Sequence, residues 1–361
     1  MNQLAGVYVI IPSLNPSNKL KLYVTALVKE GFEHIVVVND GSKELYQNIF
    51  KELSTYSEVT LLTHDQNQGK GAALKDAFDY CMKQEIQDFY GVVTADADGQ
   101  HSPEDTKRVA LALSKNPQSL ILGTRDFTGA NVPKNNRMGN QITTNVIRLL
   151  YGQTICDTQT GLRAIPVGYL EEMMRLSGNR YEFEIQVLIH AIRCKISITE
   201  VMIQTIYEDA VSESHFHVVI DSARIYGVIF ASFLKFSLSS ITSAGIDIGL
   251  FTFLTEVVFT GMSLGKSVYL ATIYARIISA IYNFLINRKV VFKSEEHLLR
   301  NLLSYFVLVI VQMFCSAELV YLGTSGLGIH QLPVKIVVDI LLFFLSYQIQ
   351  QRFIFTKKRR S

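Results

Sequence analysis

Residues 90–101 read YGVVTADADGQH, and this stretch decides the fold class. Its first half is a short run of apolar and β-branched residues, which is typical of a buried strand. The run passes directly into a polar segment that carries Asp96, Asp98 and Gln100. In open α/β sheets, ligands bind beyond the carboxyl ends of the parallel strands. The stretch therefore predicts a strand of an α/β domain, with functional residues in the loop that follows it.

Similar short runs occur on both sides of this stretch, and segments with helical spacing, such as 20–28 and 72–82, separate them. This alternation predicts a mostly parallel sheet covered by helices. The polar residues that follow the strands should then gather at one edge of the sheet. The other predicted strands are Val7 to Ile11, Ile35 to Val38, Val59 to Leu62 and Leu120 to Leu122.

The composition of the 361-residue chain changes near Tyr226. Charged residues are frequent before this point, whereas four apolar stretches follow it, each long enough to cross a hydrocarbon core of ~30 Å as a helix. We therefore expect an α/β domain at 1–225 and an all-α transmembrane domain of four helices at 226–361. The four stretches are approximately 230–259, 268–286, 302–322 and 334–354.

Basic residues are concentrated in two flanks of these stretches, from Arg288 to Arg300 and after the fourth stretch. By the positive-inside rule, both termini and the first domain lie in the cytosol of a multi-pass plasma-membrane protein. The net charge of +2 argues against nucleic acid as a partner. The four cysteines lack the CxxC or Cys/His spacings typical of zinc sites, which fits a reduced compartment. They are Cys81, Cys156, Cys194 and Cys315.

The two carboxylates of Asp96 and Asp98 can supply oxygen ligands to a hard divalent cation, Mg²⁺ or Mn²⁺. Taken alone, a short acidic loop of this kind is more often a solvated turn. Its setting changes this assessment, because four motifs in the same order resemble family 2 glycosyltransferases. These motifs are IPSLN at 11–15, VNDGS at 38–42, NQGKG at 67–71 and ADADGQH at 95–101.

Two further segments resemble one branch of that family, the enzymes that make dolichyl- or undecaprenyl-phosphate sugars. They are DTQTGLR at 157–163 and YEFE at 181–184. Together the motifs span roughly the first 215 residues. The resemblance implies an α/β GT-A (Rossmann-like) catalytic domain that is metal-dependent and inverting.

The resemblance also implies which residues bind the donor and the metal. Lys70 lies in a glycine-rich segment that lacks the spacing of a P-loop, so it would support the nucleotide pocket; a solvated surface lysine is the alternative. The residues implied to border the nucleotide-sugar are Pro12, Leu14, Asn15, Asp40, Lys70 and Asp96. The implied metal ligands are Asp96, Asp98 and Gln100.

Arg125 and Arg137 match positions that contact the acceptor phosphate in relatives. A planar guanidinium can hold two phosphate oxygens at once, although both could instead be surface arginines that pair with acids such as Asp126. Asp157 and Glu184 are candidate carboxylates for orienting either the sugar hydroxyls or the arginines. With Asp98, these four residues form the expected catalytic group.

Ser214 and His215 resemble part of a loop that closes over donor and acceptor and contacts the acceptor phosphate. This chain departs from the pattern at Glu213 and His217, and His215 could instead be a polar residue at the start of a membrane-proximal helix. Before this loop, an apolar stripe predicts an interfacial helix, although a helix packed in the core would show the same stripe. The stripe is Met138, Ile142, Val146, Leu149 and Leu150.

A lipid phosphate carries most of its second negative charge at pH 7, since its second pKa is about 6, so it needs no strong general base. We expect transfer of a hexose, glucose or N-acetylglucosamine, from a UDP-sugar to undecaprenyl or another polyprenyl phosphate at the cytoplasmic membrane face. The product would supply cell-envelope glycan modification. The expected partners are membrane lipid and further copies of the chain. A processive synthase is disfavoured because the chain has no Trp for a QxxRW motif.

The second half resembles a GtrA-type domain, especially at 283–288, a family associated with moving or presenting polyprenyl-linked sugars. A simple anchor is equally compatible with the sequence. An alternative for the whole chain is a lipid-sugar transporter with a nucleotide-binding domain. Asn287-Arg288 with Phe292 and Gln351-Arg352 with Phe355 suggest two similar helix pairs. Charged residues inside the stretches should pair or line a polar cavity. They are Asp247, Arg276, Glu318 and Asp339.

Overall fold

The structure is a computed structural model that describes residues 3–86, 88–127, 132, 134–204, 218–327 and 330–356. The chain divides into two compact units. The first comprises Met1–Leu149 and Gln153–Ile229, and the second comprises Leu150–Gly152 and Phe230–Ser361.

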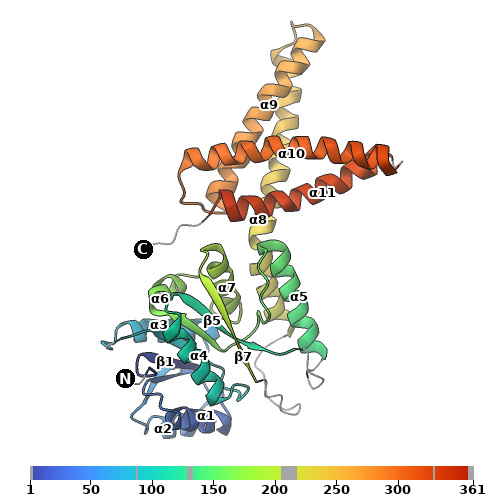
Figure 1. Ribbon diagram of the computed structural model, residues 1–361. Helices are drawn as coiled ribbons and strands as arrows, with labels where there is room; N and C mark the ends of the chain where they lie inside the picture. The colour runs from blue at the N-terminus through green and yellow to red at the C-terminus, as the bar shows by residue number, and fades with distance from the viewer. Residues whose placement is uncertain are drawn as a thin grey trace. The chain divides into compact units, whose positions relative to one another are not determined.

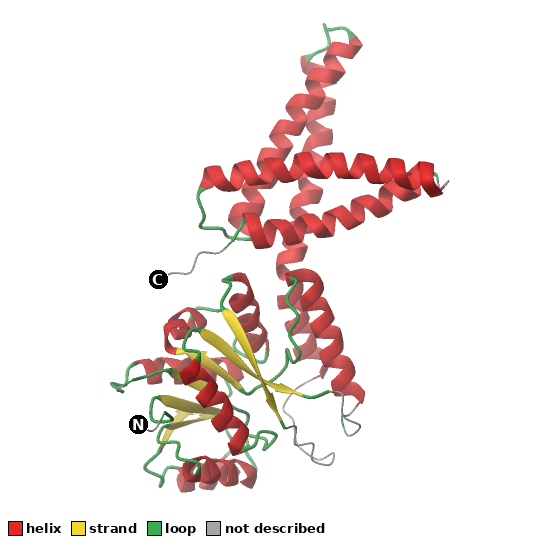
Figure 2. Ribbon diagram, in the orientation of Figure 1, coloured by secondary structure: helices red, strands yellow, loops and turns green. Residues whose placement is uncertain are grey.

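Seven strands of the first unit, among the residues described, form one sheet in the order β3-β2-β1-β4-β6-β5-β7 (Figure 2). Every pairing is parallel except those of β6, which is antiparallel to both β4 and β5. The predicted strands are all present, and the sheet is mostly parallel as expected. The strands are β1 (Val7–Ser13), β2 (Ile35–Asp40), β3 (Val59–His64), β4 (Gly91–Thr94), β5 (Ser119–Arg125), β6 (Arg163–Pro166) and β7 (Ser197–Ile203).

Strands β1, β2 and β4 form where the sequence is continuously apolar. Their residues Val9, Val37 and Val93 are completely buried, as expected for strands covered on both faces. Because β1 is parallel to both β2 and β4, the polar loops after these strands emerge at one edge, which confirms the predicted clustering.

Helices cover this sheet, and their starts follow local capping rules. Ser17 caps α1 by accepting from the backbone N–H of Lys19, and Ser102 caps α4 by accepting from Asp105. The helices of the first unit are α1 (Asn18–Lys29), α2 (Gln47–Leu53), α3 (Lys70–Met82), α4 (Pro103–Lys115), α5 (Lys134–Tyr151), α6 (Val167–Met174) and α7 (Glu182–Arg193).

Helix α5 carries the apolar stripe that the sequence analysis singled out. Met138 and Ile142 are 59% and 46% exposed, whereas the polar Asn140 and Thr143 are 4% and 1% exposed. Asn140 Nδ2 donates to the carbonyl oxygen of Cys156 at 2.6 Å. Leu150 is the buried member of the stripe, whereas Leu149 is 52% exposed, so only part of the stripe is buried.

Four helices, among the residues described, are long and apolar enough to cross a membrane. They confirm the four predicted stretches, although the first begins at Val219, earlier than expected. Two charged residues near the start of this helix pair within it, with Arg224 Nη1 3.1 Å from Asp221 Oδ1. The helices are α8 (Val218–Phe253), α9 (Leu264–Ile286), α10 (Leu298–Leu327) and α11 (Gln331–Ile349).

In the second unit, α10 packs against α11, and hydrogen bonds from Ser239 to Asn283 and from Ser243 to Ser279 join α8 to α9 (Figure 1). Three of the four charged residues singled out in these hairpins have partners, as predicted, whereas Glu318 is exposed and makes no ion pair among the described residues. Arg276 Nη2 lies 3.2 Å from Asp247 Oδ2, and Lys335 Nζ lies 2.8 Å from Asp339 Oδ1.

A single π-turn follows each of α9 and α11, and the two turns occupy equivalent positions in the two hairpins. The i+5 hydrogen bonds run from Phe292 N to Asn287 O and from Phe355 N to Gln350 O. Asn287 Nδ2 donates to Gln350 Oε1 at 3.0 Å, and the rings of Phe292 and Phe355 stack at 5.5 Å. Asn287 therefore corresponds to Gln350, not to Gln351 as the sequence comparison suggested, because the π-turn sets the register.

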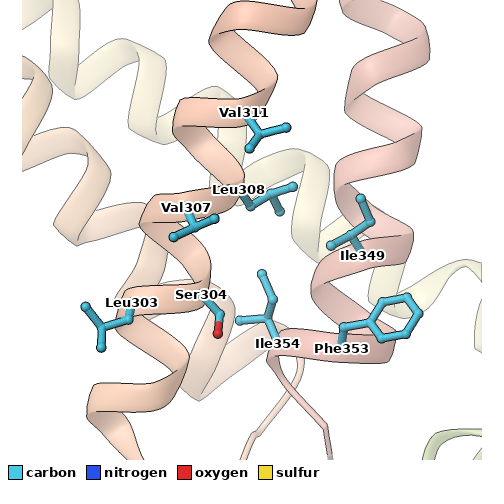
Figure 3. A pocket seen from close by; sticks show the side chains of 8 residues that line it. All are labelled: Leu303, Ser304, Val307, Leu308, Val311, Ile349, Phe353 and Ile354. Carbon is cyan, nitrogen blue, oxygen red and sulfur yellow. The ribbon is translucent and has the colours of Figure 1, made fainter.

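An apolar recess of about 430 Å³ lies between α10 and the end of α11 (Figure 3). Val307, Leu308, Ile349 and Phe353 are among its lining residues. None of the residues that line it is charged, so this recess is not a site for an anionic donor.

Candidate active site

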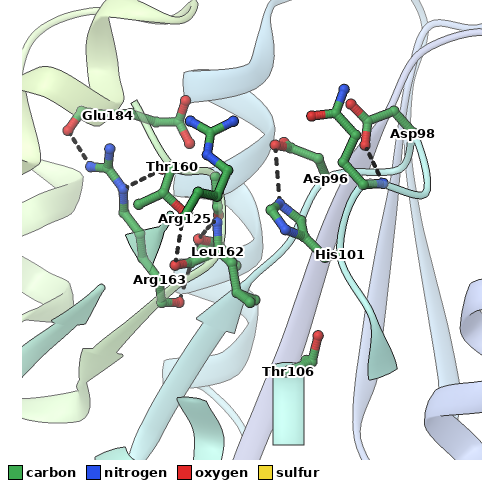
Figure 4. Close-up of polar contacts among 12 residues, drawn as sticks. Asp96, Asp98, His101, Thr106, Arg125, Thr160, Leu162, Arg163 and Glu184 are labelled. Carbon is green, nitrogen blue, oxygen red and sulfur yellow. Dashed lines mark hydrogen bonds and ion pairs between the residues drawn. The ribbon is translucent and has the colours of Figure 1, made fainter. Parts of the chain in front are cut away.

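Asp96 follows β4 and lies at the centre of a charged network. Its Oδ1 is 2.6 Å from Lys70 Nζ, and its Oδ2 is 3.5 Å from His101 Nε2 (Figure 4). Desolvation favours the neutral acid, but the interactions with Lys70 and His101 outweigh it and hold the pKa of Asp96 well below its usual value. Asp96 is thus an anion that two neighbouring groups hold in place.

Gly161 makes this position of Asp96 possible. A Cβ atom at residue 161 would lie 2.0 Å from Asp96 Oδ2. Only glycine therefore allows the loop before β6 to approach the carboxylate so closely.

Lys70, the first residue of α3, joins Asp96 to Glu184 of α7. Its Nζ lies 2.6 Å from Asp96 Oδ1 and 2.9 Å from Glu184 Oε1, and its side chain is 13% exposed. Burial alone would lower the pKa of Lys70, but these two carboxylates raise it above its usual value. The alternative of a solvated surface lysine is therefore wrong.

Asp98 lies two residues further along the same loop and is exposed. Its Oδ1 accepts a hydrogen bond from the backbone N–H of Gln100 at 3.0 Å. Desolvation and the negative charge of Asp96 raise the pKa of Asp98. In Figure 4 the carboxylates of Asp96 and Asp98 and the guanidinium of Arg125 all lie beyond the carboxyl ends of the strands. Asp98 and Gln100 together offer oxygen donors that suit a hard divalent cation.

Arg125 ends β5 and pairs with a distant carboxylate. Its Nε lies 2.7 Å from Asp157 Oδ2 and its Nη2 lies 3.1 Å from Oδ1. Asp157 is completely buried, whereas the Arg125 side chain is 15% exposed. Asp157 was predicted to orient either the sugar hydroxyls or an arginine. In the structure it pairs with an arginine.

Hydrogen bonds connect the loops that follow β1 and β2. Asn15 donates its backbone N–H to Ser42 Oγ at 2.8 Å, and its Oδ1 accepts from the backbone N–H of Lys43 at 2.9 Å. Pro12 and Leu14 lie beside them and are half-buried.

Asp40, which ends β2, is 4% exposed and accepts from the backbone N–H groups of Gln68 and Gly69, both at 2.8 Å. Its Oδ1 also lies 2.8 Å from His64 Nδ1. Asp40 thus fixes the loop that leads into Lys70, and its contact with a nucleoside stays a prediction.

Arg163 is a site residue to which the sequence analysis gave no role. It is 2% exposed, and its guanidinium donates to the carbonyl oxygens of Thr160, Glu184 and Thr158 at 2.8, 2.6 and 3.2 Å. Burial lowers its pKa, although the nearby carboxylates of Glu184, Asp157 and Asp96 oppose this effect. Arg163 therefore connects the Lys70 network with the Arg125–Asp157 pair. Arg163 is the last residue of the DTQTGLR motif, but the motif alone does not indicate that its side chain is buried.

The other residues predicted to contact the acceptor phosphate are Arg137, Ser214 and His215. Arg137 lies exposed on α5. Ser214 and His215 lie outside the described residues, so their predicted role is not tested.

Both halves of the chain match known protein families. Residues 8–173 match glycosyl transferase family 2, and residues 213–355 match the GtrA/DPMS transmembrane domain. The UDP-N-acetylglucosamine–dolichyl-phosphate N-acetylglucosaminyltransferase of Methanococcus voltae is 32% identical over 226 residues, which cover 56% of this chain and 86% of that protein. The chain belongs to glycosyl transferase family 2. The predicted fusion of a GT-A-like domain to a GtrA-like transmembrane domain is confirmed.

Two further proteins resemble this family 2 glycosyltransferase. The polyprenol monophosphomannose synthase of Mycolicibacterium smegmatis is 29% identical over 203 residues, which cover 54% of this chain and 75% of that protein. The crystal structure of glucosyl-3-phosphoglycerate synthase from Mycobacterium tuberculosis, in complex with Mn²⁺, UDP and glucosyl-3-phosphoglycerate, aligns with a TM-score of 0.48. That alignment has 14% sequence identity and covers 62% of this chain and 78% of the other.

Proposed function

We propose that this family 2 glycosyltransferase transfers a hexose from a nucleotide-sugar to the phosphate of a polyprenyl lipid at the cytoplasmic membrane face. One observation carries the proposal. A single α/β unit contains the oxygen donors that follow β4 and, at the end of β5, Arg125, which Asp157 orients. The buried Arg163 connects these two groups. A chain with four helices apolar enough to span a membrane would give this unit access to a lipid acceptor.

Asp98 and Gln100, with Asp96 beside them, would hold a divalent cation, Mg²⁺ or Mn²⁺. All their donor atoms are oxygens, and Asp98 is exposed to an incoming ligand. When bound, the cation supplies positive charge for the departing nucleoside diphosphate.

The chain's own residues would prepare the donor side. Lys70, His101 and Gly161 fix the position of Asp96, so that Asp96 can meet the ribose and diphosphate without rearranging. Pro12, Leu14 and Asn15 would border the nucleoside.

Arg125 would orient the acceptor. A lipid phosphate is largely dianionic at pH 7, so it needs positioning beside an anionic donor more than it needs a base. The ion pair with Asp157 restricts the rotamers of Arg125 in advance, and its partial exposure keeps it accessible to a phosphate. Arg137 on α5 would add a second positive charge from the membrane side.

The exposed stripe on α5 supports a location at the bilayer surface. Met138, Ile142 and Leu149 are exposed while Thr143 and Asn140 are buried, the opposite of a helix that only covers a core. An amphipathic helix with this pattern lies with its apolar face in the headgroup region. The basic flanks of the spans favour the cytoplasmic side.

For the sugar, the name of the Methanococcus voltae relative favours N-acetylglucosamine from a UDP-sugar over glucose. Undecaprenyl phosphate is the first acceptor to test, and the product would serve cell-envelope glycan modification. The Asp247–Arg276 pair inside the α8–α9 hairpin favours a polar role for the membrane domain, such as movement of the product.

The test offers the purified full-length protein a panel of labelled UDP- and GDP-sugars with undecaprenyl phosphate and Mg²⁺ or Mn²⁺. We expect label from one donor to become extractable into organic solvent. Asp98→Ala should abolish transfer, whereas Glu52→Ala, which removes an exposed ion pair with Lys21, should not. If the protein transfers no sugar from any donor, the proposal is wrong.

A further inference from the structure

Three potential metal ligands come together away from the network around Asp96. They are Glu172 on α6, His190 on α7 and Cys194 directly after α7. Their ligand atoms all lie within 4.8 Å of one another. Glu172 Oε2 is 3.0 Å from His190 Nε2, and Cys194 Sγ is 3.5 Å from the same nitrogen.

Local structure explains how the three side chains meet. His190 and Cys194 are four residues apart at the end of one helix, so their side chains lie on the same face. Glu172 approaches that face from the preceding helix, α6. The side chains of His190 and Glu172 are 10% and 19% exposed, so the cluster is sheltered but reachable from solvent.

The distances are close to those of a tetrahedral zinc site, which small side-chain rotations would complete. With Zn–N and Zn–S bonds of about 2.05 and 2.3 Å, an imidazole nitrogen and a thiolate sulfur lie about 3.5 Å apart. The Sγ to Nε2 distance of 3.5 Å matches this value, but Sγ also lies 4.0 Å from Nδ1, so the imidazole must turn for Nε2 to point at the ion. The 3.0 Å between Glu172 and His190 is a few tenths shorter than a zinc site requires and would open slightly around the ion.

The chemistry selects zinc over the metals proposed for transfer. Thiolate and imidazole suit Zn²⁺, whereas Mg²⁺ and Mn²⁺ prefer oxygen ligands. The carboxyl end of α7 adds a favourable field, because the last carbonyl groups of a helix attract cations.

We propose that Glu172, His190 and Cys194 bind a zinc ion, with water as the fourth ligand, and that this ion ties α6 to α7. The site is independent of the proposed transfer reaction. The sequence shows no spacing typical of a zinc site, because only two of the ligands are close in sequence and the third comes from another helix.

The test uses reduced full-length protein, stripped of metal by a chelator and then titrated with Co²⁺, a spectroscopic substitute for zinc. A cobalt–thiolate bond gives a near-ultraviolet charge-transfer band that oxygen ligands do not give. We expect this band to saturate at one equivalent per chain and to disappear when Zn²⁺ is added. Zinc at a hundredfold excess over its Kd should raise the Tm of the wild-type protein by about 5 °C.

Matched variants identify the ligands. Cys194→Ser should lose both the cobalt band and the zinc-dependent rise in Tm, and Glu172→Gln should weaken zinc at least about tenfold. Cys315→Ser, which changes an exposed cysteine on α10, should keep both signals, and so should Asp98→Ala. A wild-type protein without the band, or a band that persists in Cys194→Ser, would overturn the proposal. In that case Glu172 and His190 form only an ion pair.

Discussion

Asp157 fixes the guanidinium of Arg125 through both of its carboxylate oxygens, at 2.7 and 3.1 Å, and is itself completely buried. The backbone N–H of Arg125 also donates to Asp157 Oδ2 at 3.3 Å. This pair joins the end of β5 to the loop before β6 and sets the direction in which Arg125 can meet a ligand.

Asp157→Asn should therefore weaken the use of the acceptor. The amide keeps the shape of the side chain but removes the charge that orients Arg125, so we expect the KM for polyprenyl phosphate to rise at least about tenfold. The KM for the nucleotide-sugar should change little. Glu171→Gln is the matched control, since it removes an exposed ion pair with Arg175 that contributes about 0.5 kcal/mol or less. An unchanged acceptor KM in Asp157→Asn would contradict this prediction.

Gly161→Ala should inactivate the enzyme without unfolding it. The new methyl group would lie 2.0 Å from Asp96 Oδ2, so the carboxylate must move. A displacement of about 1 Å at a reacting centre can reduce the rate about 10²-fold. Gly227→Ala, where the added Cβ meets nothing within 4 Å, should keep full activity. Initial rates and circular dichroism of both variants measure the difference, and equal rates would disprove the role given to Gly161.

Lys70→Met should destabilise the first unit by about 3 kcal/mol, because it leaves Asp96 and Glu184 without their shared cation. The folded-state pKa of Lys70 is raised, so its contribution is complete below the unfolded lysine value of about 10.4 and is lost only at higher pH. The difference in unfolding free energy between wild type and variant should therefore stay constant from about pH 6 to pH 9. Denaturant unfolding at several pH values measures it. A difference that disappears near neutral pH would show that Lys70 is not held as a cation.

Ile142→Glu with Met138→Glu should impair the use of a long-chain acceptor in vesicles while leaving the Tm unchanged. Both side chains are exposed on α5, so their replacement removes contact with lipid but no core packing. We expect the KM for undecaprenyl phosphate in vesicles to rise at least about fivefold and the KM for a short, water-soluble prenyl phosphate to stay the same. Gln141→Glu adds a charge at an exposed polar position of the same helix and serves as the control. If both acceptors are affected equally, α5 does not act at the bilayer surface.

The sequence predicted strands where the pattern is local and apolar, and missed two where it is not. β6 has only four residues, begins with a buried arginine and is antiparallel to its neighbours. β7 lies at the edge of the sheet, and most of its residues are partly exposed, so it has no continuous apolar run. Both strands depend on β5 and β4 for their pairing, a long-range condition that a local pattern does not contain.

Site residues divide in the same way. Asp98 and Arg125 were found because they lie at the carboxyl ends of strands, which a parallel sheet brings together. Asp157 was found because it lies in a motif that resembles relatives. Arg163 and His101 received no predicted role, because the motifs do not indicate that these side chains are buried. In the structure Arg163 contacts Glu184, and His101 lies beside Asp96.

By itself, the amino-acid sequence determined the α/β class of the first domain, the four spans and the positions of the polar loops, because period and apolar length are properties of neighbouring residues. Only the tertiary structure decided the ionic partners. It pairs Lys70 with Asp96 and Glu184, and Arg125 with Asp157. It also brings Glu172 and Cys194 to the same nitrogen of His190. Such pairs form between segments that packing brings together, and an ion pair acts over a few ångströms of space regardless of the length of chain that separates its members.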